Sequence, residues 1–154
     1  MQDGDIAPDF ELATDSGESF KLSRLRGKPV VVYFYPKDDT SGCTIEAKDF
    51  SRLAPEFCKA GIEVIGVSPD SVESHQKFRD KHALTIRLGA DADTAVATAY
   101  GVWAQKSMYG RSYMGVERAT FLIDKDGRLA RSWRKVSVPN HAQEVLNAAR
   151  ALAI

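Results

Sequence analysis

The order of apolar and polar positions predicts strands and helices in alternation. Residues 30–35 (VVVYFY) form an unbroken β-branched and aromatic run, which is typical of a central strand covered on both faces. Residues 62–67 (IEVIGV) predict a second strand, and apolar positions at helical spacing predict a helix over residues 43–60 between them. A strand, a helix and a strand in this order predict a parallel pair with a right-handed crossover.

Shorter segments complete this pattern. Two hairpins are expected, one from residues 10–12 and 19–22 and one from residues 119–123 and 129–133, each with a glycine in its turn. Further elements are expected as a helix from Asp70 to about Lys81, a strand at 86–88, a short helix at 94–100 and a last helix from Pro139–Asn140, where Asn140 and Gln143 have capping-box spacing.

Residues 101–117 are rich in glycine and aromatic residues without a clear period, and we interpret them as a loop that borders a site. The sum is an α/β protein with a thioredoxin-like fold: a central mixed sheet, flanking helices and an N-terminal β-hairpin. With 154 residues and no linker or repeat, residues 1–154 are expected to form a single domain.

Composition and charge exclude several classes of function. Basic and acidic residues balance at 21 each, so no nucleic acid or membrane surface is expected as a partner. The N-terminus has no signal-peptide pattern, and two cysteines are too few for a disulfide framework, so we predict a cytoplasmic protein. The three histidines, His75, His82 and His141, lack metal-ligand spacing and are expected to be exposed on helices; no metal or cofactor is predicted.

The candidate chemistry lies at Cys43, where the strand 30–35 has ended and the following helix begins. The unpaired N–H groups and positive dipole end of a helix start stabilise a thiolate. At about 100° per residue, Cys43 shares the apolar face of its helix, so its sulfur should be sheltered. Glu46 falls about 60° from Cys43 on the flank of that face, an unusual place for a carboxylate without a partner.

Two further residues of this loop suit a reactive site. Pro36 ends the strand because it has no N–H to continue the ladder. Thr40 is placed to aim its hydroxyl at the same pocket or to cap the helix. The spacing alone leaves a second interpretation open, in which Cys43 is an inert core residue and Thr40 or Ser41 only caps the helix.

A family resemblance goes further. Residues 34–46 (FYPKDDTSGCTIE) closely resemble the active-site loop of peroxiredoxins, Pro-x-x-x-Thr-x-x-Cys, and the Gly-Cys-Thr-x-Glu variant is similar to the peroxiredoxin Q subfamily, also called bacterioferritin comigratory protein. Segments in the same order along nearly the whole chain fit this resemblance: 7–10, 64–70, 108–115 and 118–124.

The resemblance implies a thiol peroxidase that reduces hydrogen peroxide and organic hydroperoxides. Cys43 would be the peroxidatic cysteine and would become a sulfenic acid. Thr40 would hold the peroxide, and Pro36 would shield the thiolate. Arg118 is similar in context to the arginine that stabilises the thiolate in this family, and Glu46 would pair with that arginine.

The chain departs from the subfamily at the resolving cysteine, which many members carry five residues after the peroxidatic one. Lys48 occupies that position here. Cys58, on the same predicted helix, would lie about 22 Å from Cys43, far beyond disulfide reach. We therefore predict a one-cysteine mechanism with thioredoxin, glutathione or a glutaredoxin as reductant. Cys58 is expected to be a structural residue at the edge of the apolar face, with an intermolecular disulfide as the alternative.

Two other functions remain open from the sequence. A thioredoxin-type disulfide reductase shares the fold, although the chain has no Cys-x-x-Cys. A peroxide-sensing relay or holdase chaperone would use the same Cys43 chemistry but pass the oxidation to a partner protein. The resemblance implies a monomer, and no feature of the sequence excludes a dimer.

Overall fold

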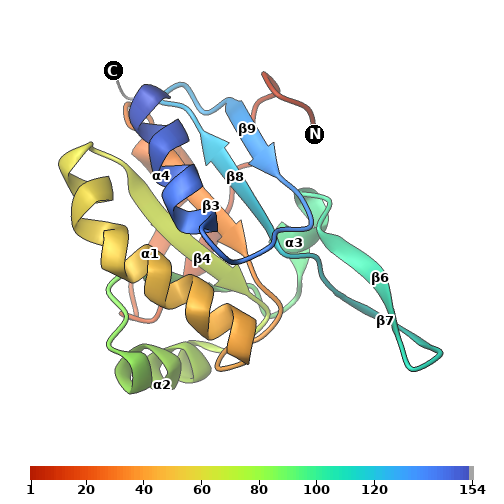
Figure 1. The fold of residues 1–154 in the computed structure, drawn as a ribbon. Coiled ribbons are helices and arrows are strands. Elements are labelled where there is room, and N and C mark those ends of the chain that lie inside the picture. Colours follow the sequence, from red (N-terminus) through yellow and green to blue (C-terminus); the bar gives the residue numbers. More distant parts are fainter. Residues whose placement is uncertain (153–154) are drawn as a thin grey trace.

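The computed structural model describes residues 1–152, which are arranged around a five-stranded mixed sheet of order β5-β4-β3-β8-β9 (Figure 1). The central strand β3 pairs in parallel with β4, which pairs in parallel with β5. On its other side β3 pairs antiparallel with β8, and β8 with β9. These strands span Val30–Phe34 (β3), Glu63–Ser68 (β4), Arg87–Ala90 (β5), Ala119–Ile123 (β8) and Leu129–Trp133 (β9).

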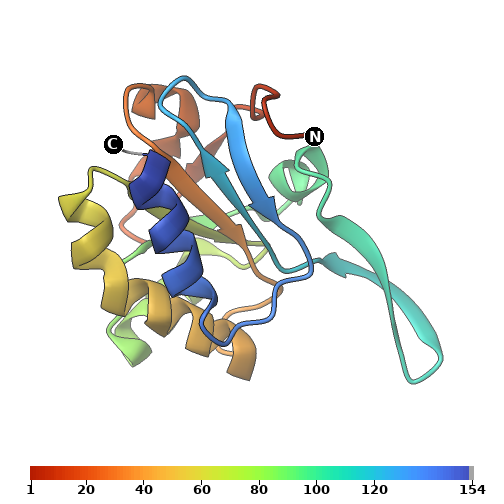
Figure 2. The same cartoon turned by 45° about the horizontal axis from the view of Figure 1, so that its top comes forward.

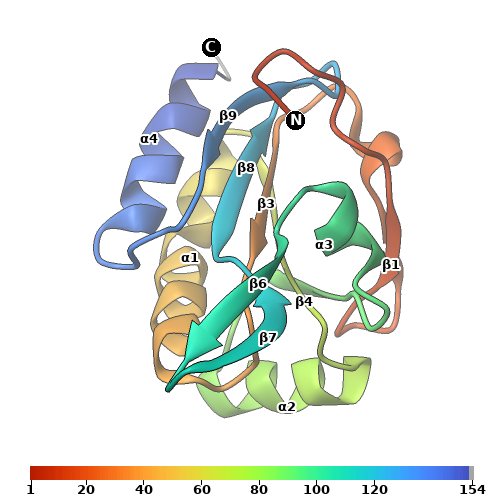
Figure 3. The ribbon, with the colours of Figure 1, turned by 90° about the vertical axis from the view of Figure 1, so that its right-hand side faces the viewer.

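Both faces of the sheet are covered, as the unbroken apolar run of β3 predicts. All five residues of β3 are buried, and they alternate between two cores. One core packs the sheet against three helices: α1 (Ser41–Lys59), α2 (Val72–His82) and α4 (His141–Leu152). The other core lies under an N-terminal hairpin and two short helices: β1 (Glu11–Ala13), β2 (Ser19–Lys21), the 3-10 helix η1 (Leu22–Leu25) and α3 (Ala95–Ala99). Figure 3 shows α1 and α4 on one side of the sheet and α3 and β1 on the other.

The β3–α1–β4 unit is confirmed, and it places Cys43 at one end of the sheet. Tyr33 of β3 stands opposite Gly66 of β4, and a Cβ at position 66 would lie 2.5 Å from the Tyr33 ring. The glycine therefore allows the ring to cross the neighbouring strand and stack on Phe50 of α1, with 4.6 Å between ring centroids. This contact fixes α1 over the carboxyl ends of β3 and β4.

Two predicted helix starts are wrong in detail. Ser71, not Asp70, is the N-cap of α2, and its hydroxyl accepts a hydrogen bond from the Ser74 N–H. The capping box predicted for α4 does not form, because Asn140 has a left-handed backbone with φ of 63° and the Gln143 amide instead bonds to Asn147. Helical spacing predicts that a helix exists more firmly than where it begins.

The segment 101–117, predicted as a loop, is mostly a β-hairpin. Strand β6 (Trp103–Met108) pairs antiparallel with β7 (Arg111–Val116). Tyr109 and Gly110 form its turn with positive φ values of 53° and 76°, the backbone of a tight hairpin turn. Figures 1 and 2 show the hairpin projecting away from the body. Because most of its residues are exposed on both faces, it lacks the apolar alternation by which a strand is recognised.

Candidate active site

Cys43 lies in the first turn of α1. The chain leaves β3 at its carboxyl end and turns into the start of α1 (Figure 1). The β3 ladder ends with the Tyr35 N–H, which donates to the carbonyl of Val67, and Pro36 follows without an N–H of its own. Helix α1 begins at Ser41, with Cys43 as its third residue, only 1% exposed. The predicted sheltered place at a helix start is confirmed.

Arg118 bridges Cys43 and Glu46. It precedes β8, whose first residue Ala119 stands opposite Phe34 at the end of β3, so the two chain segments meet beside α1. The Nη2 group of Arg118 donates to Cys43 Sγ at 3.2 Å, and its Nη1 group donates to Glu46 Oε1 at 2.7 Å. A guanidinium N–H at this distance makes a charge-assisted hydrogen bond to the sulfur. The structure thus brings together three of the five predicted site residues.

Glu46 is a buried acid with only half of its hydrogen bonds made. Its side chain is 1% exposed, and Oε2 has no partner. Burial raises the pKa of Glu46 to about 7, although the charge and hydrogen bond of Arg118 act in the opposite direction. The predicted pairing with Arg118 is present, and Glu46 is a group that titrates near neutral pH.

Gly42 makes room for the guanidinium of Arg118. A Cβ at position 42 would lie 3.2 Å from Arg118 Nη2 and 3.9 Å from its central carbon. That contact is tighter than a relaxed packing distance, so a larger residue would push the guanidinium away from the sulfur. A glycine before Cys43 therefore leaves space for the Arg118 side chain to reach the sulfur.

Thr40 occupies the N-cap position of α1, but its side chain does not cap the helix. Its hydroxyl donates to the Lys37 carbonyl at 2.8 Å, which leaves the hydroxyl lone pairs to accept a hydrogen bond. Thr40 is exposed and Pro36 is half-buried. The roles predicted for them, holding a peroxide and shielding the thiolate, stay predictions.

Comparison with known proteins places this site in a family. The model of the AhpC/TSA family matches residues 4–132. The chain belongs to this family, as a peroxiredoxin of the Q type. A Bacillus subtilis (strain 168) protein named Peroxiredoxin Bcp is 52% identical over 143 residues, which cover 93% of this chain and 91% of that protein. The Peroxiredoxin Bcp of Escherichia coli (strain K12) is 40% identical over 147 residues, 96% of this chain and 94% of that protein.

Solved structures agree with the sequence relatives. A structure of Xanthomonas campestris peroxiredoxin Q has a TM-score of 0.90 and 44% identity, covering 94% of this chain and 92% of that one. A second structure, of the X. campestris bacterioferritin comigratory protein, comes from work on its alkyl peroxide reduction activity and also has a TM-score of 0.90, with 43% identity over 94% of this chain and 92% of that one. The thioredoxin-like fold and the thiol-dependent peroxidase activity predicted from the sequence are confirmed.

The second cysteine lies on the same helix as Cys43, as predicted, but it is not buried. Cys58 is exposed near the C-terminal end of α1, rather than buried as a structural residue, and neither cysteine is in a disulfide. The error came from the edge of the apolar face, where a small change of helix orientation decides exposure.

The histidines were also wrongly predicted as exposed. His75 is fully buried and His141 is 4% exposed, while His82 is half-buried. The His141 Nε2 lies 2.8 Å from the Thr120 hydroxyl, and burial lowers the pKa of His141 to about 4, with a smaller contribution of the same sign from Arg118. Spacing templates for metal ligands gave no signal for such satisfied core histidines.

His75 belongs to a buried polar cluster that sequence reasoning missed altogether. Its Nδ1 lies 2.7 Å from Asp38 Oδ2, and the Asp38 N–H donates to Asp70 Oδ2 at 2.8 Å. Atoms of these three side chains that could bind a metal lie within 4.8 Å of one another. Each of them already has a hydrogen-bond partner in the protein, so hydrogen bonding alone accounts for the cluster.

The β6–β7 hairpin supplies a further cation near the site. Lys106 is half-buried, and its stem lies 3.2 Å from the place of a Cβ at Gly115 on the opposite strand. Burial lowers the pKa of Lys106, and the charge of Arg118 acts in the same direction, whereas Cys43 opposes it. The segment expected to border the site therefore does lie within electrostatic range of it.

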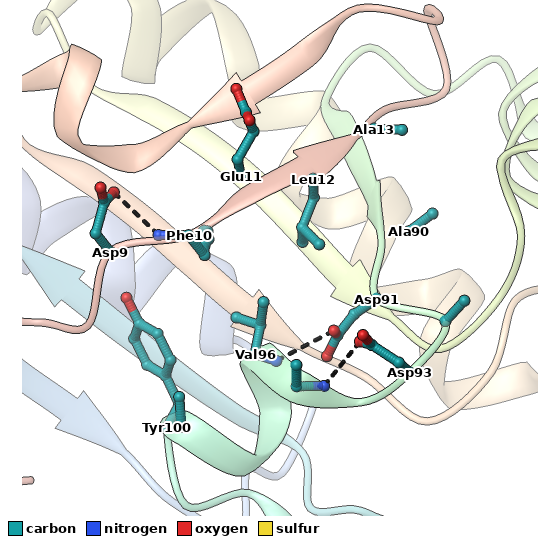
Figure 4. Close-up of a pocket in the computed structure, with 13 residues that line it drawn as sticks. Asp9, Phe10, Glu11, Leu12, Ala13, Ala90, Asp91, Asp93, Val96 and Tyr100 are labelled. Carbon is teal, nitrogen blue, oxygen red and sulfur yellow. Dashed lines mark hydrogen bonds between the residues drawn. The ribbon is translucent and has the colours of Figure 1, made fainter.

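A hollow of about 520 Å³ lies elsewhere, between β1 and α3 (Figure 4). Its large apolar lining residues belong to the core on the opposite face of the sheet from Cys43. Two of its acids are engaged with backbone: the buried Asp91 accepts from the N–H groups of Val96 and Ala97, and the exposed Asp9 accepts from those of Phe10 and Ser23. The hollow therefore holds no convergent free polar groups for a ligand.

Proposed function

We propose that Cys43 is the peroxidatic cysteine of this enzyme. The observation that carries the proposal is the Arg118 guanidinium at 3.2 Å from Sγ, with the sulfur in the first turn of a helix. The thiolate attacks one peroxide oxygen, the O–O bond breaks, and Cys43 becomes a sulfenic acid. The other oxygen leaves as hydroxide or alkoxide and takes up a proton to give water or an alcohol.

The other site residues assist this step. Arg118 stabilises the thiolate and the negative charge that develops on the breaking O–O bond, and Glu46 holds Arg118 in position. Thr40 accepts a hydrogen bond from the peroxide through its free lone pairs, because its own proton is bound to Lys37. Pro36 closes the site on the strand side.

An external thiol returns the enzyme to its reduced form. The thiol attacks the sulfenic sulfur and releases water, and a second thiol resolves the mixed disulfide to free Cys43. This one-cysteine route is supported by Lys48 at the common resolving position and by Cys58 at the far end of α1, about 22 Å away along the helix. Thioredoxin, glutathione or a glutaredoxin would serve as the thiol.

The substrates are proposed to be hydrogen peroxide and organic hydroperoxides. The X. campestris relative, studied for alkyl peroxide reduction, supports the organic class. We propose that the protein works as a cytoplasmic monomer. None of the described helices is long and apolar enough to cross a membrane.

The test is peroxide consumption with thioredoxin and thioredoxin reductase, comparing wild type with Cys43→Ser and Cys58→Ser. We expect Cys43→Ser to lose activity and Cys58→Ser to keep it. Loss in both variants would refute the one-cysteine route, and activity in Cys43→Ser would refute the whole assignment. Slow turnover with every small thiol, together with a mixed disulfide trapped on one partner protein, would instead support the relay function.

A further inference from the structure

The loop that leads into Cys43 is tied to α2 by two adjacent aspartates. Asp38 accepts hydrogen bonds from Ser74 Oγ at 2.8 Å and from His75 Nδ1 at 2.7 Å. Asp39 accepts from Lys81 Nζ at 2.6 Å and His82 Nε2 at 2.8 Å. We call Asp38 with His75 the inner pair and Asp39 with His82 the outer pair. The two pairs differ mainly in burial, which makes one a natural control for the other.

The inner pair is a buried ion pair. The side chains of His75 and Asp38 are 0% and 5% exposed. Both ring nitrogens of His75 face acceptors, Nδ1 the Asp38 carboxylate and Nε2 the Gly89 carbonyl at 2.9 Å, so the ring carries both protons and a positive charge. Burial alone would lower the pKa of His75, but the hydrogen bond and charge of Asp38 raise it above its usual value.

The inner pair is also linked to the strand and to β4. The Tyr35 hydroxyl donates to Asp38 Oδ1 at 2.6 Å, and the Asp38 N–H donates to Asp70 Oδ2, which also accepts from Ser68 Oγ at the end of β4. Asp38 is therefore the residue that ties the loop both to α2 and to the sheet. From there only four residues lead to Cys43, which meets Arg118 from the other side.

We propose that the inner pair positions Cys43 for reaction: by fixing Asp38 on α2, it holds the following turn so that the sulfur stays enclosed and in contact with Arg118. Asp38 and His75 are positioning residues, since neither touches the sulfur. The outer pair has an exposed aspartate, 41% accessible, so water can replace its contacts at little cost. The inference rests on the proposed role of Cys43.

Two reactions of reduced Cys43 separate positioning from overall stability. Consumption of hydrogen peroxide in a single turnover requires the sulfur beside Arg118, whereas alkylation by iodoacetamide requires only an accessible thiolate. A misplacement on the order of 1 Å lowers the rate of an aligned reaction by up to about 100-fold. In His75→Gln and Asp38→Asn we expect the peroxide rate to fall about tenfold or more relative to the iodoacetamide rate of Cys43.

The matched control is Asp39→Asn, in the same loop and bound to the same helix. We expect both of its rates to stay within about twofold of wild type. If His75→Gln leaves the ratio of the two rates unchanged, the inner pair is only structural and the inference is wrong, even if the variant unfolds more easily. An equal loss in Asp39→Asn would also overturn it. His75→Gln keeps the test usable if Asp38→Asn does not fold.

Failure of this inference is distinct from failure of the proposed function. If Cys43→Ser abolishes peroxide consumption and the inner-pair variants keep wild-type rates, Cys43 is the reacting thiol but the inner pair does not position it. If Cys43→Ser remains active, the assignment of the thiol itself is wrong.

Discussion

Replacing Glu46 by Gln tests whether the buried carboxylate lowers the free energy of unfolding. Burial raises the pKa of Glu46 from its usual value near 4.5 to about 7. The folded state therefore keeps the proton through this range while the unfolded state releases it, so stability falls as pH rises through the window from 4.5 to about 7. Above that window the difference amounts to about 3 kcal/mol.

Gln has nearly the same shape, carries no charge, and can still accept the hydrogen bond of Arg118 through its carbonyl oxygen. We expect Glu46→Gln to be more stable than wild type by about 3 kcal/mol at about pH 8, and by less than about 1 kcal/mol at about pH 5. Because the side chain is 1% exposed, solvent screening does not reduce this figure much.

The assay is urea unfolding of reduced protein at the two pH values, with the slope of the transition checked to be unchanged. Glu56→Gln is the matched control, since Glu56 lies on the same helix in an exposed pair with Arg150. It should change stability by less than about 1 kcal/mol at either pH. If Glu46→Gln is instead less stable than wild type at the higher pH, the ion pair with Arg118 outweighs burial and our reasoning fails.

Two further variants test the surroundings of Arg118. Gly42→Ala should leave the free energy of unfolding unchanged or raise it by about 0.5 kcal/mol through helix propensity. It should also lower the peroxide rate about tenfold, because its Cβ would lie 3.2 Å from Arg118 Nη2. Urea unfolding and single-turnover kinetics measure the two effects, and an unchanged peroxide rate would contradict the steric argument. For His141, whose pKa is lowered to about 4 by burial, the folded state takes up its proton later than the unfolded state, so wild type should lose up to about 3 kcal/mol as pH falls from about 6.5 to 4. His141→Gln should lack that loss in unfolding curves across the same range, and an unchanged pH slope would refute it.

The core of the fold was predictable from the sequence because its strongest signals are local. An apolar run such as residues 30–35 is stable only in a strand that is buried on both faces of a sheet. The helix after it has an apolar face that determines how it packs on that sheet. The hairpin β6–β7 escaped prediction for the opposite reason: exposed on both faces, it carries no periodic burial, and only the Tyr109–Gly110 turn signalled it.

The candidate site was predictable in part. The position of Cys43 in its first helical turn follows from the strand, loop and helix pattern. The pairing of Glu46 with Arg118 came from the resemblance, since 72 residues separate the two partners and no local pattern records a contact of that range. Neither the local pattern nor the resemblance predicted the inner pair. A buried histidine and an exposed one cannot be told apart in a sequence until the partner, here Asp38, is known.

The single guanidinium of Arg118 donates hydrogen bonds to both Cys43 Sγ and Glu46 Oε1. Burial disfavours the ionised form of Glu46, although the charge and hydrogen bond of Arg118 act in the opposite direction. A pKa of about 7 for Glu46 lets its proton leave or stay at little cost near neutral pH. Since the thiolate is the reactive form, a neutral Glu46 leaves the full charge of Arg118 to the sulfur, while its carbonyl oxygen still holds the guanidinium in place.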